Sequence, residues 1–462
     1  MKKISVIGMG YVGTAMATLI ASTKKGKNKK YFVTGIEQSS KSGKAISKKI
    51  NSGILPIEIN DNNFKNKFLV ATNKEKNLVC SNSIKDIRGS KIVIVSINCD
   101  LEKKKNSTVN LKSFLNSIEI ILLNIDRDAL LIVESTIPPG TCEKKIVPLI
   151  SKIFRKRGFK KNETLLAYTY ERVMPGDNYL NSIKNYWRVM SGVNKKSILE
   201  CKKFLKEIIN TKKYPLTELK NIRDCELGKI LENSYRSTNI AFIEEWSRFA
   251  EAIDVDIYKV IESIRLRPTH SNIRHPGFGV GGYCLTKDPL FGEYAAKNIW
   301  NIKKLKFPFS KQAMKVNDEM YLITYNKIKK IFKENIKNKK ILILGMSYKE
   351  NVGDLRSSPS IYFSNKCEKK GAKFFWHDPF IKSVPNKKIT KINTVKNLSR
   401  FDLVVFTVKH NVYKKINFDK KSIKNTIIFD ANYVLTDSQL AKIKNNKINF
   451  YSIGRGSLWK KY

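Results

Sequence analysis

A glycine-rich stretch in the second half of the chain ends in residues that can react. Residues 276–288 read PGFGVGGYCLTKD, with four glycines within six residues followed by Cys284, Lys287 and Asp288. Glycines let a backbone approach a ligand closely, so this pattern is typical of an ordered loop at a site. A thiol beside a lysine is more readily ionised and can act as a nucleophile. A buried structural cysteine is the competing interpretation, and the glycine loop favours the nucleophile.

A second candidate group is a lysine and an amide spaced for one face of a helix. Lys229 and Asn233 lie four residues apart in a segment of helix-forming residues. Residues with that spacing lie one above the other on a helix, and two hydrogen-bond donors side by side suit a developing oxyanion. A solvated helix face is the alternative, and it is the commoner one in so lysine-rich a chain.

A third candidate follows an apolar run. Residues 134–141 read ESTIPPGT and come directly after the run 129–133. Polar side chains at the end of a strand, stiffened by two prolines, suit a preorganised site. An ordinary turn leading into a helix is the alternative for this segment.

The N-terminus carries a dinucleotide-binding fingerprint. Gly8, Gly10 and Gly13 follow the apolar run 4–7 and open a helix through Tyr11 and Val12. The first glycine permits the tight turn, the second lets a diphosphate reach the backbone, and the third lets the helix pack closely on the strand. The helix N-terminus then faces the diphosphate. A signal peptide or a glycine turn without a ligand is the alternative interpretation.

An acidic residue after the second apolar run selects between the two nicotinamide cofactors. Glu37 directly follows the run 31–36. A carboxylate there accepts a hydrogen bond from the ribose 2′-hydroxyl and repels a 2′-phosphate. The sequence therefore predicts NAD as the cofactor, in preference to NADP.

The elements that must position these residues form two similar halves around a helical middle. Short runs rich in β-branched residues, separated by helical patterns, indicate parallel sheets covered on both faces. The segment 224–266 reads as long amphipathic helices. The predicted fold class is α/β, with two doubly wound Rossmann-like domains joined by an α-helical middle domain, in residues 1–200, 201–305 and 306–462. The strand-like runs are 4–7, 31–36, 91–95, 129–133, 339–345, 374–376, 403–408 and 427–430.

The charge of the chain does not by itself indicate a nucleic-acid partner. Lys and Arg number 88 against 40 Asp and Glu, for a net charge of +48. The excess is mostly lysine, is spread along the chain and accompanies many Asn and Ile residues, which an A/T-rich genome explains. We therefore expect no nucleic-acid partner, although so basic a protein attracts anionic small molecules.

The cysteine, histidine and hydropathy patterns argue against a disulfide-bonded protein, a metal-binding protein and a membrane protein. The seven cysteines form no CxxC pair and the four histidines have no metal-ligand spacing, so we expect reduced thiols and no metal. No uncharged apolar run reaches the roughly 18 residues that span a bilayer. We therefore expect a cytoplasmic protein without membrane contact.

The order of these motifs resembles that of the UDP-glucose/GDP-mannose dehydrogenases, a family of NAD-dependent nucleotide-sugar 6-dehydrogenases. The resemblance covers nearly the whole chain. It rests on the fingerprint at 8–13, ESTIPPGT at 134–141, YERVMPG at 170–176, the pair at 229 and 233, PGFGVGGYCLTKD at 276–288, and GMSYKENVGDLRSSP at 345–359.

The resemblance implies a role for each candidate residue. Cys284 would be the nucleophile, Lys229, Asn233 and Asp288 would surround the reacting C6, and Thr136 and Glu171 would serve hydrolysis of a thioester. The remaining implied contacts are, for NAD, Gly8, Gly10, Tyr11, Val12, Gly13, Glu37, Thr136 and Arg356, and for the substrate, Lys229, Asn233, Phe278, Gly279, Gly281, Tyr348 and Lys349.

The resemblance also implies the reaction: a four-electron oxidation of the C6 alcohol of a UDP-sugar to a uronate, for surface polysaccharide synthesis. The sequence Glu171-Arg172-Val173 is more similar to the branch that acts on UDP-N-acetylhexosamines such as UDP-ManNAc or UDP-GlcNAc, whereas Lys287 is more usual in the UDP-glucose branch. We expect the first, with UDP-glucose as the alternative. The helical middle domain would form a homodimer or a higher homo-oligomer.

Two features depart from the family pattern, and two other classes of protein stay open as alternatives. Ser96-Ile97-Asn98 stands where the family often has Thr-Pro. His270 or Ser271 stands at the position of an arginine that reaches the partner subunit in many members, with Arg267 and Arg274 nearby. A two-electron hydroxy-acid dehydrogenase shares the fingerprint but does not explain Cys284 or the second sheet domain. A basic nucleic-acid-binding protein is the alternative outside enzymes.

Overall fold

The computed structural model describes residues 1–26, 28–102, 108–159, 165–419, 423 and 425–456. The described chain forms two compact units. The first comprises Met1–Glu232 and Leu290–Phe307, and the second comprises Asn233–Pro289 and Pro308–Tyr462. The three domain ranges expected from the sequence stay a prediction.

The first unit is built on an eight-stranded sheet in the order β10-β9-β8-β7-β6-β1-β4-β5. Every neighbouring pair is parallel except β8 and β9. The strand order reverses direction between β1 and β6, and ligands of doubly wound sheets bind outside the carboxyl ends of the strands at such a point. The strands are β1 (Lys2–Ile7), β4 (Tyr31–Ile36), β5 (Leu78–Ser81), β6 (Ile92–Val95), β7 (Leu130–Val133), β8 (Leu166–Tyr170), β9 (Val189–Gly192) and β10 (Thr217–Glu218).

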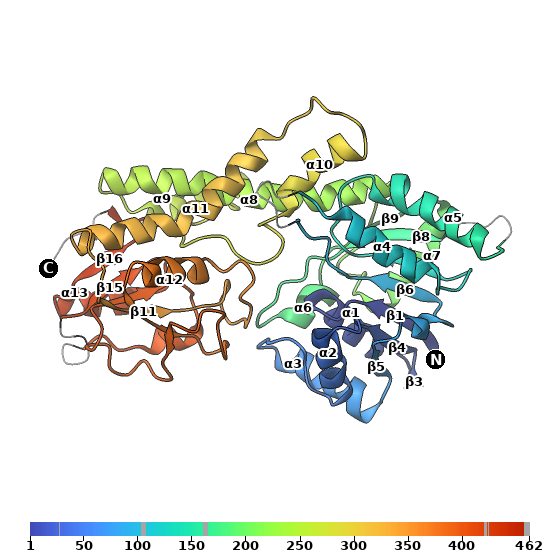
Figure 1. Ribbon diagram of the computed structural model, residues 1–462, viewed down its shortest axis with the longest axis horizontal. Helices are drawn as coiled ribbons and strands as arrows, with labels where there is room; N and C mark the ends of the chain where they lie inside the picture. The colour runs from blue at the N-terminus through green and yellow to red at the C-terminus, as the bar shows by residue number, and fades with distance from the viewer. Residues whose placement is uncertain (27, 103–107, 160–164, 420–422, 424, 457–462) are drawn as a thin grey trace. The chain divides into compact units, whose positions relative to one another are not determined.

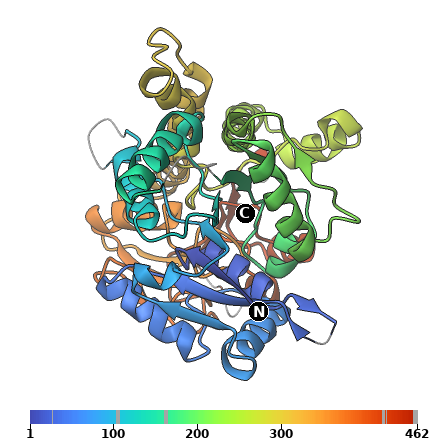
Figure 2. The same ribbon diagram turned by 90° about the vertical axis from the view of Figure 1, so that its right-hand side faces the viewer.

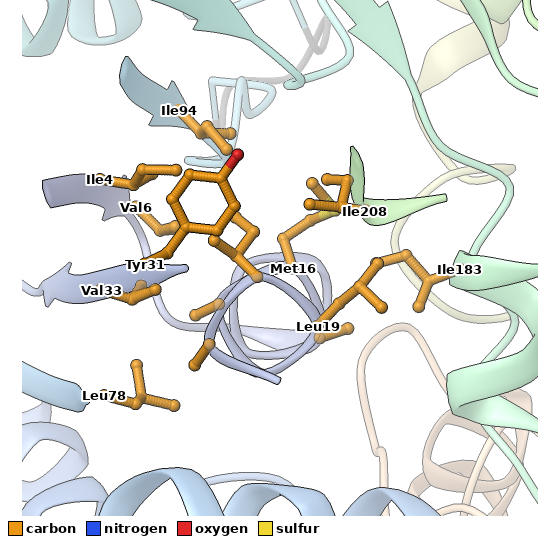
Figure 3. Packing of buried hydrophobic residues seen from close by; sticks show 14 of the residues in the cluster. Ile4, Val6, Met16, Leu19, Tyr31, Val33, Leu78, Ile94, Ile183 and Ile208 are labelled. Carbon is orange, nitrogen blue, oxygen red and sulfur yellow. The ribbon is translucent and has the colours of Figure 1, made fainter. Parts of the chain in front are cut away.

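Successive residues of these strands point to opposite faces of the sheet, so their side chains enter two separate hydrophobic cores. Ile94 of β6 and Ile132 of β7 join one hydrophobic cluster, while their neighbours Val95 and Val133 join the other. Figure 3 shows the first cluster, in which Ile4, Val6 and Val33 of the sheet face Met16 and Leu19 of α1. Because helices bury both faces of the sheet, consecutive residues of these strands are apolar.

Helices cover both faces of this sheet (Figures 1 and 2). The first cluster is closed by α1 (Tyr11–Ala21), α2 (Lys41–Asn51), α3 (Asn62–Leu69), α6 (Tyr179–Lys184) and α7 (Lys195–Ile208). The second is closed by α4 (Leu111–Leu122), α5 (Val147–Lys156), α10 (Phe291–Asn298) and the beginning of α8 (Ile222–Ala252). In Figure 2 the teal helices α4 and α5 lie on the side of the blue strands opposite to α2 and α3.

Side-chain caps determine where several of these helices begin. Ser40 accepts a hydrogen bond from the Gly43 N–H at 3.1 Å, and Asn194 accepts from the Ser197 N–H at 2.8 Å. Such caps satisfy backbone donors that have no partner within the helix. Smaller elements of this unit are β2 (Lys24–Lys25), β3 (Asn28–Lys29), the 3₁₀ turn Ile84–Ile87 and the π-helical turns Val70–Lys74 and Cys142–Ile146.

The second unit has a six-stranded, all-parallel sheet in the order β13-β12-β11-β14-β15-β16. Its order reverses direction between β11 and β14. One face packs against α11 (Pro308–Ile331) and α12 (Pro359–Lys369), as Figure 1 shows, and α9 (Ile257–Arg265) and α13 (Asp437–Asn445) are further helices of this unit. The strands are β11 (Lys340–Leu344), β12 (Lys373–His377), β13 (Thr390–Lys391), β14 (Leu403–Phe406), β15 (Ile427–Asp430) and β16 (Phe450–Ser452).

This architecture confirms the predicted fold class. Both sheets are doubly wound, and α8 with α9 forms the helical segment expected between them in the chain. The apolar runs did not reveal β5, β8, β9, β10, β13 or β16, which are short or carry polar residues. In the part of the chain that the structure describes, no helix is long and apolar enough to cross a membrane.

Candidate functional site

The glycine fingerprint forms a cradle that fits a dinucleotide. A Cβ atom on Gly13 would lie 1.8 Å from the Gly8 carbonyl oxygen, so only glycine allows α1 to pack this closely on β1. Gly8 has φ +88°, the left-handed region that favours glycine. A Cβ on Gly10 would meet none of the described residues within 4 Å, so the N-terminus of α1 is open where a diphosphate would bind. Tyr11 and Val12, both half-buried, form the first turn of that helix.

Glu37 lies beside this cradle, as the sequence predicts. Its Oε1 atom accepts a hydrogen bond from the Met9 N–H at 2.5 Å, and its own N–H bonds to the Ser81 carbonyl at 2.9 Å. These bonds fix the carboxylate at the end of β4, next to the glycine turn. The carboxylate is then in place to accept from a ribose hydroxyl.

A buried ion pair supports the polar segment after β7. Arg188 Nη1 donates to Glu134 Oε1 at 2.7 Å, and Ser96 Oγ donates to Glu134 Oε2 at 3.1 Å. Burial raises the pKa of Glu134, although Arg188 opposes the shift. Ser135 Oγ donates to the Ile97 carbonyl at 2.6 Å, and half-buried Thr136 follows it. The ends of β6 and β7 are thereby tied together at the point where Thr136 leaves the sheet.

Lys229 and Glu171 form a buried acid–base pair. Lys229 Nζ donates to the Glu171 carbonyl oxygen at 2.7 Å and lies 3.5 Å from its Oε1 atom. The ammonium also lies 5.6 Å from the centre of the Tyr170 ring. Burial raises the pKa of Tyr170 to about 12, so the phenol stays protonated at neutral pH. Lys229 from α8 and Glu171 from the end of β8 therefore form one group.

A second carboxylate of α8, Glu226, holds the turn that follows Thr136. It is fully buried, and its two oxygens accept from the Gly140 N–H at 2.5 Å and the Cys142 N–H at 2.8 Å. Burial raises the pKa of Glu226 to about 7. On the other side of the turn, Trp300 Nε1 donates to the Pro139 carbonyl at 2.9 Å. The turn is thus held by two residues that the sequence analysis did not identify.

In the second unit, a buried carboxylate connects the expected residues around Cys284. Asp288 Oδ2 accepts from Asn233 Nδ2 at 2.7 Å, and Asp288 Oδ1 pairs with Lys287 Nζ at 2.6 Å. The Cys284 carbonyl accepts from the Asp288 N–H at 2.9 Å and the Lys287 N–H at 3.2 Å. Cys284 itself is exposed, whereas the other six cysteines are buried. Lys287 therefore balances Asp288 directly, in addition to lying near the thiol in sequence.

The glycine-rich loop before Cys284 packs tightly on the substrate-binding segment expected after β11. A Cβ on Gly281 would lie 2.5 Å from Tyr348 Cβ, and a Cβ on Gly282 would lie 2.8 Å from the Tyr348 ring. Gly279 would similarly clash with Pro359 at 2.7 Å. The side chain of Phe278 is buried in the core of this unit, 5.5 Å from the Phe363 ring. Only the backbone of Phe278 is therefore available for the substrate contact that the sequence predicts.

The remaining expected residues surround the same loop. Tyr348 and Lys349 are half-buried in the turn after β11, and the Tyr348 N–H bonds to the Asp354 carbonyl at 3.0 Å. Arg356 is exposed, pairs with Asp354 at 2.7 Å and stacks over the Tyr283 ring at 5.4 Å. Its proposed contact with NAD stays a prediction.

In the first unit the structure pairs Lys229 with Glu171 and places Glu37 beside the glycine cradle. In the second unit it links Asn233 and Lys287 through Asp288. Glu134, Arg188 and Glu226 were missed as partners because each contacts residues far away in sequence. The only local signal was Glu134, the first residue of the polar segment. Among the described residues, no group of histidine, cysteine and acidic side chains is arranged to hold a metal ion.

Comparison with known proteins agrees with this geometry. Three models of the UDP-glucose/GDP-mannose dehydrogenase family match, with the NAD binding domain at residues 2–211, the central domain at 223–319 and the UDP binding domain at 342–437. A UDP-N-acetyl-D-mannosamine dehydrogenase from Methanocaldococcus jannaschii is 32% identical over 95% of this chain and 92% of its own. A protein of the same name from Pyrococcus horikoshii is 28% identical over 99% of this chain and 100% of its own.

A solved structure extends the agreement to the fold. The structure of UDP-D-ManNAc dehydrogenase from Pyrococcus horikoshii matches with a TM-score of 0.80 and 25% identity, over 98% of this chain and all of that one. The chain belongs to the UDP-glucose/GDP-mannose dehydrogenase family. It is an NAD-dependent oxidoreductase, and the open cradle at Gly10 beside Glu37 fits that cofactor.

Proposed function

We propose that this protein is a UDP-sugar 6-dehydrogenase that oxidises the C6 alcohol of UDP-N-acetylmannosamine to the carboxylate. Two relatives that match nearly the full chain carry the name UDP-N-acetyl-D-mannosamine dehydrogenase, and the C-terminal sheet domain matches the family's UDP binding domain. UDP-glucose is the second candidate, favoured by Lys287. The uronate product serves surface polysaccharide synthesis.

The first oxidation requires removal of the hydroxyl proton and stabilisation of the developing alkoxide. Bound NAD⁺ accepts a hydride in each of the two oxidations. The amide of Asn233 is held by Asp288, and the ammonium of Lys229 is held by Glu171, so both donors are fixed in orientation. Donors that are already oriented stabilise a charge that forms only in the transition state. Asp288, buried and able to accept, takes part in moving the hydroxyl proton.

The second oxidation requires that the aldehyde stays on the enzyme. The Cys284 thiolate adds to the aldehyde carbon and forms a thiohemiacetal, which loses a second hydride and becomes a thioester. Overall, one alcohol, one water and two NAD⁺ yield one carboxylate, two NADH and three protons. The carbonyl of Cys284 is bound by two backbone N–H groups, so the residue is held in a defined turn while its side chain is exposed.

Hydrolysis releases the product and restores the thiolate. Glu171 takes a proton from the attacking water, and Lys229 beside it balances the carboxylate. Thr136, held at the end of β7 by the Glu226 and Glu134 contacts, orients the water or the carbonyl. Thiolate leaves as the tetrahedral intermediate collapses, which completes the four-electron cycle.

The observation that carries this proposal is that Cys284 is the one exposed cysteine of the seven, all of which lie in the described residues, and adjoins the buried Asn233–Asp288–Lys287 group. A two-electron dehydrogenase has no use for such a thiol. The decisive experiment incubates the protein with NAD⁺ and a panel of UDP-ManNAc, UDP-GlcNAc, UDP-glucose and GDP-mannose, and follows NADH absorbance. We expect the highest kcat/KM with UDP-ManNAc; a preference for UDP-glucose would transfer the assignment to that branch, and no NADH with any nucleotide sugar would refute it.

We further propose that α8 makes a homodimer. Phe242, Trp246 and Phe249 are each about half exposed and recur every three to four residues, which places them on one face of α8. Ile253, also about half exposed, follows directly after the helix. A second copy of this chain is the occupant that such a face implies in this family. Trp246→Glu should convert the dimer to a monomer in light scattering after size exclusion, whereas Leu266→Glu, at an exposed apolar position outside α8, should not.

The site of action is proposed to be the cytoplasm. None of the seven cysteines, all of which lie in the described residues, is in a disulfide, and six of them are buried, which supports a reducing compartment. NAD and UDP-sugars are also cytoplasmic metabolites. Fractionation of cells followed by the NADH assay tests this assignment.

A further inference from the structure

A buried histidine, aspartate and serine lie together at the carboxyl ends of three neighbouring strands in the second unit. Ser347 follows β11, Asp378 follows β12 and His410 follows β14. These are the strands around the point where the sheet order reverses, where doubly wound sheets bind their ligands. All three side chains are buried, with at most 2% of their surface exposed.

The hydrogen bonds determine which nitrogen of His410 carries the hydrogen. The Asn351 N–H donates to His410 Nδ1 at 3.0 Å, so Nδ1 is an acceptor and the hydrogen is on Nε2. His410 Nε2 lies 3.1 Å from Asp378 Oδ2 and 3.1 Å from Ser347 Oγ. Serine and aspartate thus meet the same nitrogen. A relay of the Ser-His-Asp kind needs them on opposite nitrogens, so this cluster is not a nucleophilic triad.

The cluster instead holds both ends of the turn that carries Tyr348 and Lys349. Asp378 Oδ2 accepts from the Met346 N–H at 2.8 Å and the Ser347 N–H at 2.9 Å, which fixes the beginning of the turn. His410 fixes its end through Asn351. Burial acts to raise the pKa of Asp378, but the bonds from His410 and from the Ser347 and Phe380 N–H groups outweigh it and hold the pKa below its usual range.

We propose that His410, oriented by Asp378, is a positioning residue that sets Tyr348 and Lys349 for the nucleotide part of the substrate. The inference rests on the proposed function and on the predicted contact of Tyr348 and Lys349 with the nucleotide part of the substrate. We expect His410 to affect the affinity for UDP and not the affinity for NAD, because both of its ring nitrogens make their polar contacts with residues of the second unit. The ring makes no direct contact with substrate, since it is completely buried.

The test is a series of substitutions at His410, in which the Kd of UDP and the KM of NAD⁺ are measured for each variant. His410→Phe keeps a planar aromatic ring but removes the polar contacts of both nitrogens. His410→Asn keeps an acceptor near Nδ1, and His410→Gln keeps a donor near Nε2. His377→Phe is the control, because the same change is made at the last residue of the neighbouring strand β12, where Nδ1 contacts the Tyr413 hydroxyl at 3.1 Å and not the turn.

For His410→Phe we expect the Kd of UDP from calorimetry and the KM of the UDP-sugar to rise about ten-fold, the effect of losing a hydrogen bond to a charged group. Losses should be smaller for His410→Asn and His410→Gln. The KM of NAD⁺ and the value of kcat should change by less than about three-fold, and His377→Phe should bind UDP normally. If His410→Phe does not fold, the two milder variants give the same comparison.

A double-mutant cycle separates positioning from general destabilisation. If His410 acts through Lys349, then His410→Phe should weaken UDP binding much less in a Lys349→Met background than in the wild type. The inference would be overturned if the effects of the two substitutions on UDP binding were fully additive, or if His410→Phe left the UDP affinity unchanged. It would also be overturned if His410→Phe raised the KM of NAD⁺ as much as that of the UDP-sugar. In each case a wild type that is active leaves the proposed function intact. A wild type that neither binds UDP nor oxidises any UDP-sugar would overturn both.

Discussion

Glu244 should make the stability of the second unit depend on pH, and replacing it should remove that dependence. The residue is on α8, is 1% exposed and leaves Oε2 without a hydrogen-bond partner among the described residues. Burial raises the pKa of Glu244 to about 8, with Glu251 adding to the shift and Arg248, the Gly277 N–H and Lys327 opposing it. Because Gly277 begins the loop that leads to Cys284, this carboxyl connects α8 to the proposed nucleophile.

The sign and size of the effect follow from linkage. A carboxyl whose pKa is raised on folding contributes stability that is complete below the unfolded pKa of 4.5 and is lost as pH rises through about 8. A pKa that differs by one between the folded and unfolded protein corresponds to about 1.4 kcal/mol in the free energy of unfolding. Between pH 6 and pH 9 the wild type should therefore lose about 3 kcal/mol through Glu244, which is about 6–12 °C in Tm for a domain of this size.

Glu244→Gln is neutral at every pH and has the same shape, so it should not lose this stability. The assay is thermal unfolding of both proteins by intrinsic fluorescence at pH 6 and pH 9. The Tm of Glu244→Gln minus that of the wild type should increase by several degrees at the higher pH. Other titrating groups cancel, because both proteins carry them. The neighbouring substitution Glu245→Gln, at an exposed position on the same helix, is the control and should show no such change.

A Tm difference between Glu244→Gln and wild type that is equal at the two pH values would refute this reasoning. It would mean that the buried carboxyl is ionised in the folded protein at pH 6, or that the site opens to water before the unit unfolds. A difference that shrinks at pH 9 would show that the carboxylate, and not the acid, is the stabilising form.

Four further predictions concern the reaction and its supports. Cys284→Ala should lose uronate formation by several orders of magnitude with little change in Tm, and the wild type should form two NADH per sugar by coupled mass spectrometry and absorbance; one NADH would remove the four-electron mechanism. Glu171→Gln should accumulate a covalent sugar adduct visible in intact-mass spectra, and an unmodified enzyme turning over normally would exclude Glu171 as the hydrolytic base. NADP⁺ should be used at least about 100-fold less efficiently than NAD⁺, because Glu37 would face the extra phosphate; equal kcat/KM would disprove this contact. Glu226→Gln should cost about 2 kcal/mol in urea unfolding, since an amide supplies one acceptor where two N–H groups need one each. Glu143→Gln, a half-buried position of the same segment that loses only a surface ion pair with Arg223, should cost little.

The sequence by itself was sufficient for features that depend on neighbouring residues. Gly8, Gly10 and Gly13 predict the cradle because a tight turn, an open helix end and a close helix–strand contact are all decided within a few residues. The long apolar strands and the helices α8 and α9 were likewise predictable, since burial on two faces or on one stripe leaves a periodic pattern. The family resemblance then supplied residue roles that spacing alone does not.

Short strands at or near the sheet edges were not predictable from local pattern. β8 contains Thr169 between two tyrosines, and β10 has only two residues, both exposed. Such segments become strands because a neighbouring strand offers hydrogen bonds, and that neighbour is distant in the chain. Phe278 illustrates the same point at the level of one side chain, because a position in a glycine loop gave no sign that the ring is buried beside Phe363.

The tertiary structure alone decided which buried charges are paired. Glu226 reaches back to the turn at Gly140, Arg188 neutralises Glu134, and His410 joins Asp378 to the turn before Asn351. In sequence each of these residues is an isolated polar position. Each buried charge needs a partner, because burying an unpaired charge costs free energy. Which residue is that partner depends on which strand ends and helices lie next to one another once the sheets have assembled.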